Sequence, residues 1–272
     1  MFSFLFSGGK NGDDQTPPDN AAAAPQCPAP PSDHKWEITY FAHRGRADLA
    51  LILLKLAGED VNVRWIIWAT FVALRDECNA FPFRYLPTML HEESGQVISE
   101  SKALARLGAK VAKLIPDDPV IAAQADSFVD RLMDMKTTQF YVPGTPSDLV
   151  EQCRVQLEAT CNALKAVMAM QEGDSDWLLG DKMCWADVSL FVEVDGLSLW
   201  DPELMAWFET AFPKLHQIVE RVRSLPAVTK LLNDTEWSKG ASWPPNFSYG
   251  PGSKCGCVRK GPCVIFDTVV IY

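Results

Sequence analysis

The sequence is poor in positive charge and has no long apolar run. It carries 25 Lys and Arg residues against 35 Asp and Glu residues, a net charge of −10, which argues against nucleic acid and anionic membrane surfaces as partners. The longest apolar run, Leu49 to Leu54, ends at Lys55, whereas a membrane-spanning helix needs about 20 apolar residues. We therefore expect a protein with no nucleic-acid partner and no transmembrane segment.

The cysteines show no regular spacing. Eight are scattered over 272 residues, and in a chain long enough to bury a core this usage is typical of reduced thiols in a cytosol-like compartment. The apolar start, Met1 to Ser7, is too short for the core of a signal peptide. Cys255, Cys257 and Cys263 lie near the end without a histidine, and their spacing matches no four-ligand zinc pattern. The sequence predicts a cytoplasmic protein without a metal.

Composition divides the chain into four parts. Residues 1–35 form an arm rich in Pro and Ala that has too few apolar residues to offset chain entropy, so we expect it to be disordered. Two domains are expected at 36–114 and 119–235, joined by a Pro- and Asp-rich linker. Residues 236–272 form an irregular, cysteine-containing tail.

Strand and helix patterns alternate in the first of these domains. Trp36, Ile38 and Tyr40 alternate with polar residues, and Val61 to Ile67 is β-branched, so both stretches predict strands. Further strands are expected after Pro87 and around residues 95–99, with helices between them, giving the order β-α-β-α-β-β-α. Beyond the linker the pattern is helical throughout. We predict an α/β thioredoxin-like N-terminal domain followed by an all-α helical-bundle C-terminal domain.

The segment after the first strand is a place where chemistry is expected. Tyr40 ends that strand, and a loop containing Arg44 and Arg46 leads into an apolar helix. The N–H groups of a helix start, together with two arginines, favour a bound anion. The alternative is that Tyr40 only ends a strand and both arginines are solvated.

The run from Tyr40 to Asp48, Tyr-Phe-x-x-Arg-Gly-Arg-Ala-Asp, resembles the opening of the soluble glutathione transferases. It is most similar to the sigma class, which includes glutathione-dependent prostaglandin D synthases and S-crystallins. A second match is the helix-capping motif that contains Gly180, Ala186 and Asp187, although Cys184 stands where the family has a hydroxyl. A thiol is a weak acceptor, so this substitution predicts a poorer cap. The resemblance extends from Trp36 to about Asn233.

The resemblance implies that glutathione is the co-substrate and assigns residues to it. Tyr40 and Arg46 are expected to stabilise the glutathione thiolate and are the catalytic residues. Pro87 begins a strand, where a trans proline is usual, but we favour the family's cis proline, with the Leu86 backbone binding the cysteinyl part. Glu100 and Ser101 are expected to hold the γ-glutamyl end, although a simple helix cap is an alternative.

Four further assignments follow from position in the family. Phe71 replaces a sigma-class tryptophan near the glycyl end of glutathione, and Arg75 is expected to bind the glycyl carboxylate. Asp134 is expected to approach the γ-glutamyl amine of a neighbouring subunit, since relatives complete each site across a homodimer interface. Tyr141 is a candidate wall of the electrophile pocket.

The function that this resemblance implies is attack of an activated glutathione thiol on a small apolar electrophile, by conjugation or isomerisation. The alternative is a non-catalytic structural or binding protein of the same fold. Cysteine-based thiol transfer is disfavoured, because there is no Cys-x-x-Cys motif and no cysteine between Trp36 and Leu74.

Overall fold

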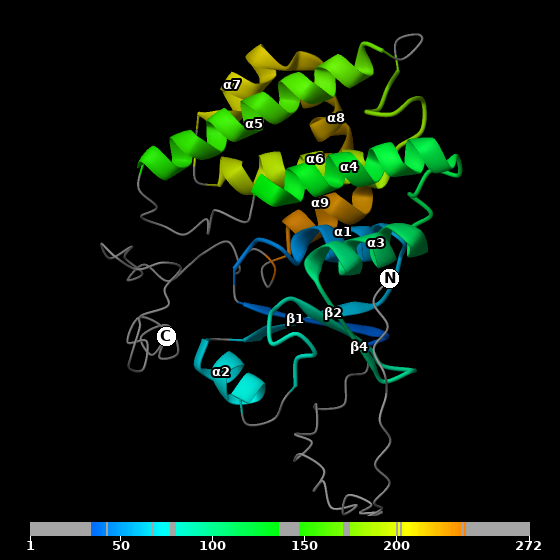
Figure 1. Ribbon diagram of the computed structural model, residues 1–272, viewed down its shortest axis with the longest axis vertical. Helices are drawn as coiled ribbons and strands as arrows, with labels where there is room; N and C mark the ends of the chain where they lie inside the picture. Colours follow the sequence, from blue (N-terminus) through cyan, green and yellow to red (C-terminus); the bar gives the residue numbers. More distant parts are fainter. Residues whose placement is uncertain are drawn as a thin grey trace, which may run out of the picture.

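The computed structural model describes residues 34–41, 43–66, 68–76, 80–135, 147–170, 175–199, 201, 203–234 and 237. Tyr141, nearly all of the predicted arm and nearly all of the predicted tail lie outside these residues. Figure 1 shows a small sheet with helices on both faces, and a group of helices beyond one of those faces. The α/β thioredoxin-like part followed by an all-α part is thus confirmed.

The sheet has four strands in the order β2-β1-β3-β4. β1 runs parallel to β2 and antiparallel to β3, and β3 runs antiparallel to β4. β1 is therefore a central strand, and all of its residues except Phe41 are buried. The strands are β1 (Trp36–Phe41), β2 (Val61–Ile66), β3 (Thr88–His91) and β4 (Gln96–Ser99).

Three helices cover the sheet. α1 (Asp48–Leu56) and α3 (Ser101–Val111) pack against each other on the face toward the other helices, while α2 (Trp68–Asp76) lies on the opposite side (Figure 1). Gly108 allows the close packing of α1 and α3, because a Cβ there would lie 3.0 Å from Leu53 Cβ. The element order agrees with the predicted β-α-β-α-β-β-α, and the helix expected between the second and third strands is α2, which ends at Asp76.

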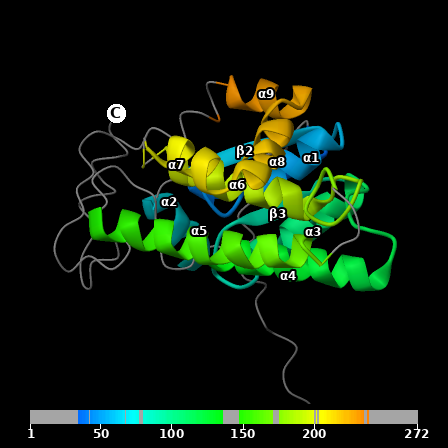
Figure 2. The same cartoon turned by 90° about the horizontal axis from the view of Figure 1, so that it is seen from above.

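The remaining helices form the second part of the molecule. In Figure 2, α4 and α5 run side by side along one edge of it. All residues of α6 from Trp185 to Leu197 are buried, so this helix is the centre of the packing. The helices are α4 (Pro119–Met135), α5 (Ser147–Met168), α6 (Trp185–Ser198), α7 (Leu204–Ala211), α8 (Pro213–Arg223) and α9 (Pro226–Leu232).

The start of α6 carries the capping box that the sequence indicated. Asp187 accepts hydrogen bonds from the backbone N–H groups of Cys184 and Leu178, both at 2.8 Å, and the Cys184 thiol completes the box. Burial raises the pKa of Asp187 to about 6 and also raises that of the Cys184 thiol. A thiol therefore takes the place of the family's hydroxyl with the box intact.

The two parts share one core. α1 contacts α6 and α9 as well as α3, and its residues Leu49 to Leu54 are all buried. The apolar run that begins just after the predicted site thus joins the sheet to the helical part. None of the helices in the described ranges has the length and apolar character that crossing a membrane requires.

Candidate active site

A cavity of about 260 Å³ opens beside the start of α3. Residues from three segments of the first domain line it: the loop before α1, the loop before β3, and the β4–α3 junction. Its lining residues are Arg46, Tyr85, Leu86, Pro87, Ser99, Glu100 and Ser101. The structure therefore brings together five residues that the sequence assigned to the site, although they are up to 55 positions apart, from Arg46 to Ser101.

The Tyr40 hydroxyl lies behind Arg46. Tyr40 is only 3% exposed, and its hydroxyl oxygen accepts a hydrogen bond of 3.2 Å from the Arg46 backbone N–H. Burial raises the pKa of Tyr40 well above its ordinary value, so the hydroxyl stays protonated at neutral pH. Its hydrogen is not used in the bond with Arg46, which leaves Tyr40 able to donate to an anion.

Gly45 makes room for this hydroxyl. A Cβ at position 45 would lie 3.0 Å from the Tyr40 hydroxyl oxygen and 3.6 Å from Nδ1 of His43. The tyrosine is thus positioned by a close approach of the backbone, which only glycine permits without displacement.

His43 is a buried neighbour that the sequence did not single out. Its Nδ1 lies 2.9 Å from the Arg44 carbonyl oxygen, its ring packs edge-on against Tyr40 at 5.1 Å between centroids, and it stacks on Phe41 at 5.9 Å. Burial lowers the pKa of His43, which keeps the ring neutral. The imidazole therefore supports the Tyr40 ring without adding a charge beside it.

Arg44 was expected either to help bind an anion or to be solvated, and the structure shows neither. Its side chain is buried, so it is not solvated, and it contacts protein carboxylates rather than the cavity. Nε donates to Asp48 at 2.7 Å and Nη2 donates to Asp195 on α6 at 3.1 Å. The guanidinium also lies 3.5 Å from the ring centroid of Trp237. The positive charge of Arg44, four positions after Tyr40, thus fixes the loop to the helical part.

The β4–α3 junction has an unusual backbone. Glu100 adopts a φ of 76°, in the left-handed region, and is exposed, whereas Ser101 is buried at the first position of α3. Next to it, Lys102 Nζ pairs with Asp134 of α4 at 2.8 Å and with Asp130 at 3.3 Å. Asp134 therefore lies near the start of α3 in its own chain, and its approach to a neighbouring subunit stays a prediction.

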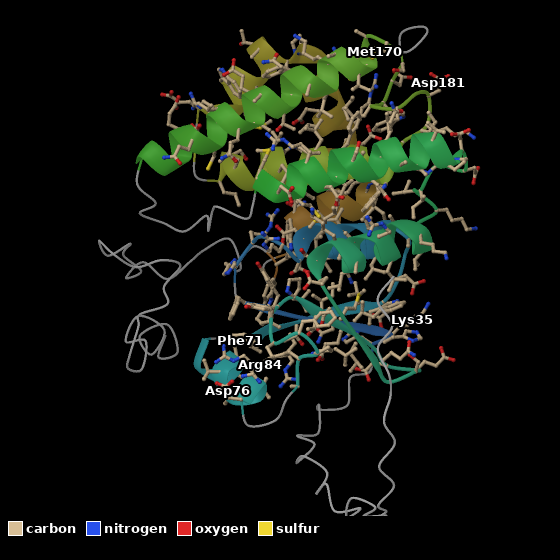
Figure 3. All side chains as sticks on the ribbon, viewed as in Figure 1. Lys35, Phe71, Asp76, Arg84, Met170 and Asp181 are labelled. Carbon is tan, nitrogen blue, oxygen red and sulfur yellow. The ribbon has the colours of Figure 1, made fainter. Side chains whose placement is uncertain are left out.

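Four predicted residues in the described ranges do not line the cavity: Tyr40, Phe71, Arg75 and Asp134. Of these, Phe71 and Arg75 belong to helix α2. Phe71 is buried in an aromatic cluster with Phe81, stacked at 5.5 Å between centroids. Arg75 donates two hydrogen bonds to Asp76, at 2.8 and 2.7 Å, and Arg84 pairs with the same carboxylate. Figure 3 shows Phe71, Asp76 and Arg84 together at α2, on the far side of the sheet from the helical part. The assignment of Phe71 and Arg75 to the glycyl end of glutathione stays a prediction.

The chain matches known proteins in both parts. Residues 137–235 match the family model described as "Glutathione S-transferase, C-terminal domain". A chicken (Gallus gallus) hematopoietic prostaglandin D synthase is 28% identical over 198 residues, which cover 71% of this chain and 92% of that protein. S-crystallin 3 of Enteroctopus dofleini is 24% identical, with coverages of 72% and 95%.

Solved structures show the same fold. Glutathione S-transferase Na-GST-3 of Necator americanus superimposes with a TM-score of 0.61 at 23% identity, covering 72% of this chain and 95% of that one. Rat hematopoietic prostaglandin D synthase gives 0.57 at 22% identity, with coverages of 72% and 95%. The chain therefore has the glutathione transferase fold. It is similar to the glutathione transferases as a family, and its relatives include the prostaglandin D synthases and S-crystallins that the sequence indicated.

Proposed function

We propose that this protein is a glutathione transferase that binds glutathione in the cavity and activates its thiol for attack on a small apolar electrophile. The observation that carries the proposal is the Tyr40 hydroxyl. It is buried and protonated, and it accepts a hydrogen bond of 3.2 Å from the backbone N–H of Arg46, a residue that lines the cavity. A donor in this state can stabilise a thiolate.

Tyr40 and Arg46 together can supply the free energy that lowers the pKa of the bound thiol. A free thiol has a pKa of about 8.5 and is only a few per cent ionised at neutral pH. Lowering that pKa by about two units requires about 2.7 kcal/mol, at about 1.36 kcal/mol per unit. One charge-assisted hydrogen bond from Tyr40 and the positive charge of Arg46 can supply this together.

The remaining lining residues suit the cysteinyl backbone and the γ-glutamyl end of glutathione. Leu86 and Pro87 form one wall, where the cysteinyl backbone is proposed to bind. Glu100 offers a carboxylate to the γ-glutamyl ammonium group, and the N–H groups at the start of α3, with Ser101, suit the carboxylate of the same end. The site thus matches the charges of a γ-glutamyl group.

A non-catalytic role is the second candidate. It is favoured by the S-crystallin among the relatives and by the place of Phe71 and Arg75, which lie outside the cavity lining that would hold the glycyl end. The enzyme is favoured by Arg46 on the cavity wall and by the protonated Tyr40 hydroxyl bonded to its N–H.

Three measurements separate these functions: isothermal titration with glutathione, thiolate absorbance of the complex, and conjugation with a chromogenic aryl halide. An enzyme gives binding, a thiolate band at pH 7 and turnover. Binding without thiolate or turnover supports the non-catalytic candidate. Absence of glutathione binding overturns the enzyme and leaves only a structural role for a protein of this fold.

We also propose a cytoplasmic location. Cys161 and Cys184 are buried thiols that form no disulfide, the state that is typical of a reducing compartment such as the cytosol. Fractionation with a cytosolic marker tests the location.

A further inference from the structure

Ser99 is a lining residue of the cavity that neither the sequence nor the family resemblance assigned to a ligand. It is the last residue of β4 and is only 8% exposed. Its hydroxyl oxygen is buried and has no hydrogen-bond partner among the residues that the structure describes. A buried hydroxyl without a partner costs free energy, so its presence on a cavity wall points to a ligand.

The strand register locates Ser99 between two groups of the proposed site. Ser99 pairs with Thr88 of β3, and Thr88 directly follows Leu86 and Pro87. On its other side Ser99 directly precedes Glu100. Ser99 therefore lies where the wall proposed for the cysteinyl backbone meets the wall proposed for the γ-glutamyl end.

We propose that Ser99 Oγ hydrogen-bonds the peptide link that joins the γ-glutamyl and cysteinyl parts of bound glutathione. This inference rests on the proposed function. The link has one C=O and one N–H, and a hydroxyl can donate to the first or accept from the second. Ser99 would thereby contact the part of glutathione that lies between its γ-glutamyl end and its cysteinyl part.

A matched control exists in the helical part. Ser189 of α6 is also a fully buried serine whose hydroxyl oxygen has no partner among the described residues, but it does not line the cavity. Ser99→Ala and Ser189→Ala therefore make the same chemical change at two buried positions, and only the first changes a residue of the cavity lining.

The test is isothermal titration of the full chain with glutathione and with γ-glutamylcysteine, which keeps the link but lacks the glycine. We expect Ser99→Ala to weaken both ligands equally, by about 2- to 10-fold, the value of one neutral hydrogen bond. The melting temperature without ligand should not fall, since no protein hydrogen bond is lost. Ser189→Ala should leave both affinities unchanged, and the isosteric Ser99→Cys, a weak donor, should behave as Ser99→Ala.

Four results overturn the inference. Unchanged affinity of Ser99→Ala, while the wild type binds glutathione, overturns it and leaves the proposed function intact. An equal loss in Ser189→Ala shows that the effect is not one of the cavity. If Ser99→Ala loses affinity for glutathione but not for γ-glutamylcysteine, Ser99 does not contact the peptide link that the two ligands share. Failure of the wild type to bind glutathione overturns the proposed function first, and the inference with it.

Discussion

Arg44 donates a hydrogen bond to Asp195 at 3.1 Å, across 151 positions of the sequence. The other oxygen of Asp195 accepts a hydrogen bond of 2.9 Å from Arg223 of α8, and Arg44 also binds Asp48 at the start of α1. The loop that carries Arg46 is thus held to α6 by a buried ion pair, and Arg223 of α8 shares the carboxylate of that pair. Three predictions about the site depend on this loop staying in place, and the first prediction is about the bond itself.

Removing the Asp195 charge should strongly destabilise the protein. Asp195→Asn leaves two arginines without their shared carboxylate, one of them buried, and breaking a buried ion pair on one side costs about 3–5 kcal/mol. The free energy of unfolding in urea measures this cost. Asp176→Asn is the control, because Asp176 pairs with Arg221 at the surface with 65% of its side chain exposed. Exposed pairs contribute about 0–1 kcal/mol, and equal losses in the two variants would contradict the prediction.

Replacing Tyr40 by phenylalanine should reduce conjugation far more than binding. The change removes one charge-assisted hydrogen bond, about 1.5–3 kcal/mol, which corresponds to about 10- to 150-fold in rate. Glutathione affinity should change little, because its proposed contacts are made mainly by other residues. Tyr85→Phe is the control: Tyr85 also lines the cavity but is 73% exposed, and its loss should leave the rate near wild type. A Tyr40→Phe enzyme with full activity would make Tyr40 structural.

The dependence of the conjugation rate on pH should reflect ionisation of the glutathione thiol and not of Tyr40. The raised pKa of Tyr40 keeps its hydroxyl protonated and donating up to at least about pH 9. The rate should therefore rise with pH through the pKa of bound glutathione, at about 6.5 if the site lowers it by two units, and then stay level. Tyr40→Phe should move this midpoint upward, toward about 8.5. Initial rates between pH 5 and 9 measure both, and a fall in wild-type rate above pH 8 would indicate that a tyrosinate forms.

A methyl group at position 45 should displace the tyrosine. In Gly45→Ala the new Cβ would lie 3.0 Å from the Tyr40 hydroxyl oxygen, so either the loop or the ring must move and activity should fall by at least about 10-fold, as one transition-state hydrogen bond is misplaced. Gly196→Ala is the control, because a Cβ there meets nothing within 4 Å. In that helix the change should stabilise by up to about 1 kcal/mol. Full activity of Gly45→Ala would show that the close approach is not needed.

We expect a homodimer at micromolar concentration, because the family resemblance implies one. The sequence also suggested that the helix from Val120 buries Leu132 and Met133 in the two-fold interface. Both are buried within the single chain, at 0% and 1% exposure, so they are not available as interface residues and that part of the argument is wrong. The prediction now rests on the family alone, in which the Necator americanus structure is described as monomeric. Light scattering decides, and a mass of one chain, 30.2 kDa, would remove Asp134 from a shared site.

Local patterns were enough to predict the order of strands and helices. Alternation at Trp36, Ile38 and Tyr40 and the β-branched run from Val61 each depend on neighbours a few positions apart, and the cis bond before Pro87 is present as favoured. Five of the seven residues that line the cavity were named from motifs. Arg44 was misread because its partner, Asp195, is far away in sequence and no local pattern marks it.

His43 and Ser99 were missed for related reasons. A histidine in a loop carries no periodic signal, and its contact with Tyr40 depends on how the chain turns at Gly45. Ser99 reads as the end of a strand, and only the register with Thr88 and the burial of its oxygen distinguish it from an ordinary serine. Side chains whose role depends on what surrounds them in space require the structure.

The pairing of Lys102 with Asp134 has a consequence for salt. Lys102 also pairs with Asp130, so it keeps one carboxylate if Asp134 turns to the ammonium group of a ligand. Binding would then exchange one ion pair for another rather than create a new one. Added salt weakens both pairs alike, and its effects cancel. A ligand amine recognised by Asp134 should therefore bind with an affinity that hardly responds to ionic strength, unlike one that meets an unpaired carboxylate.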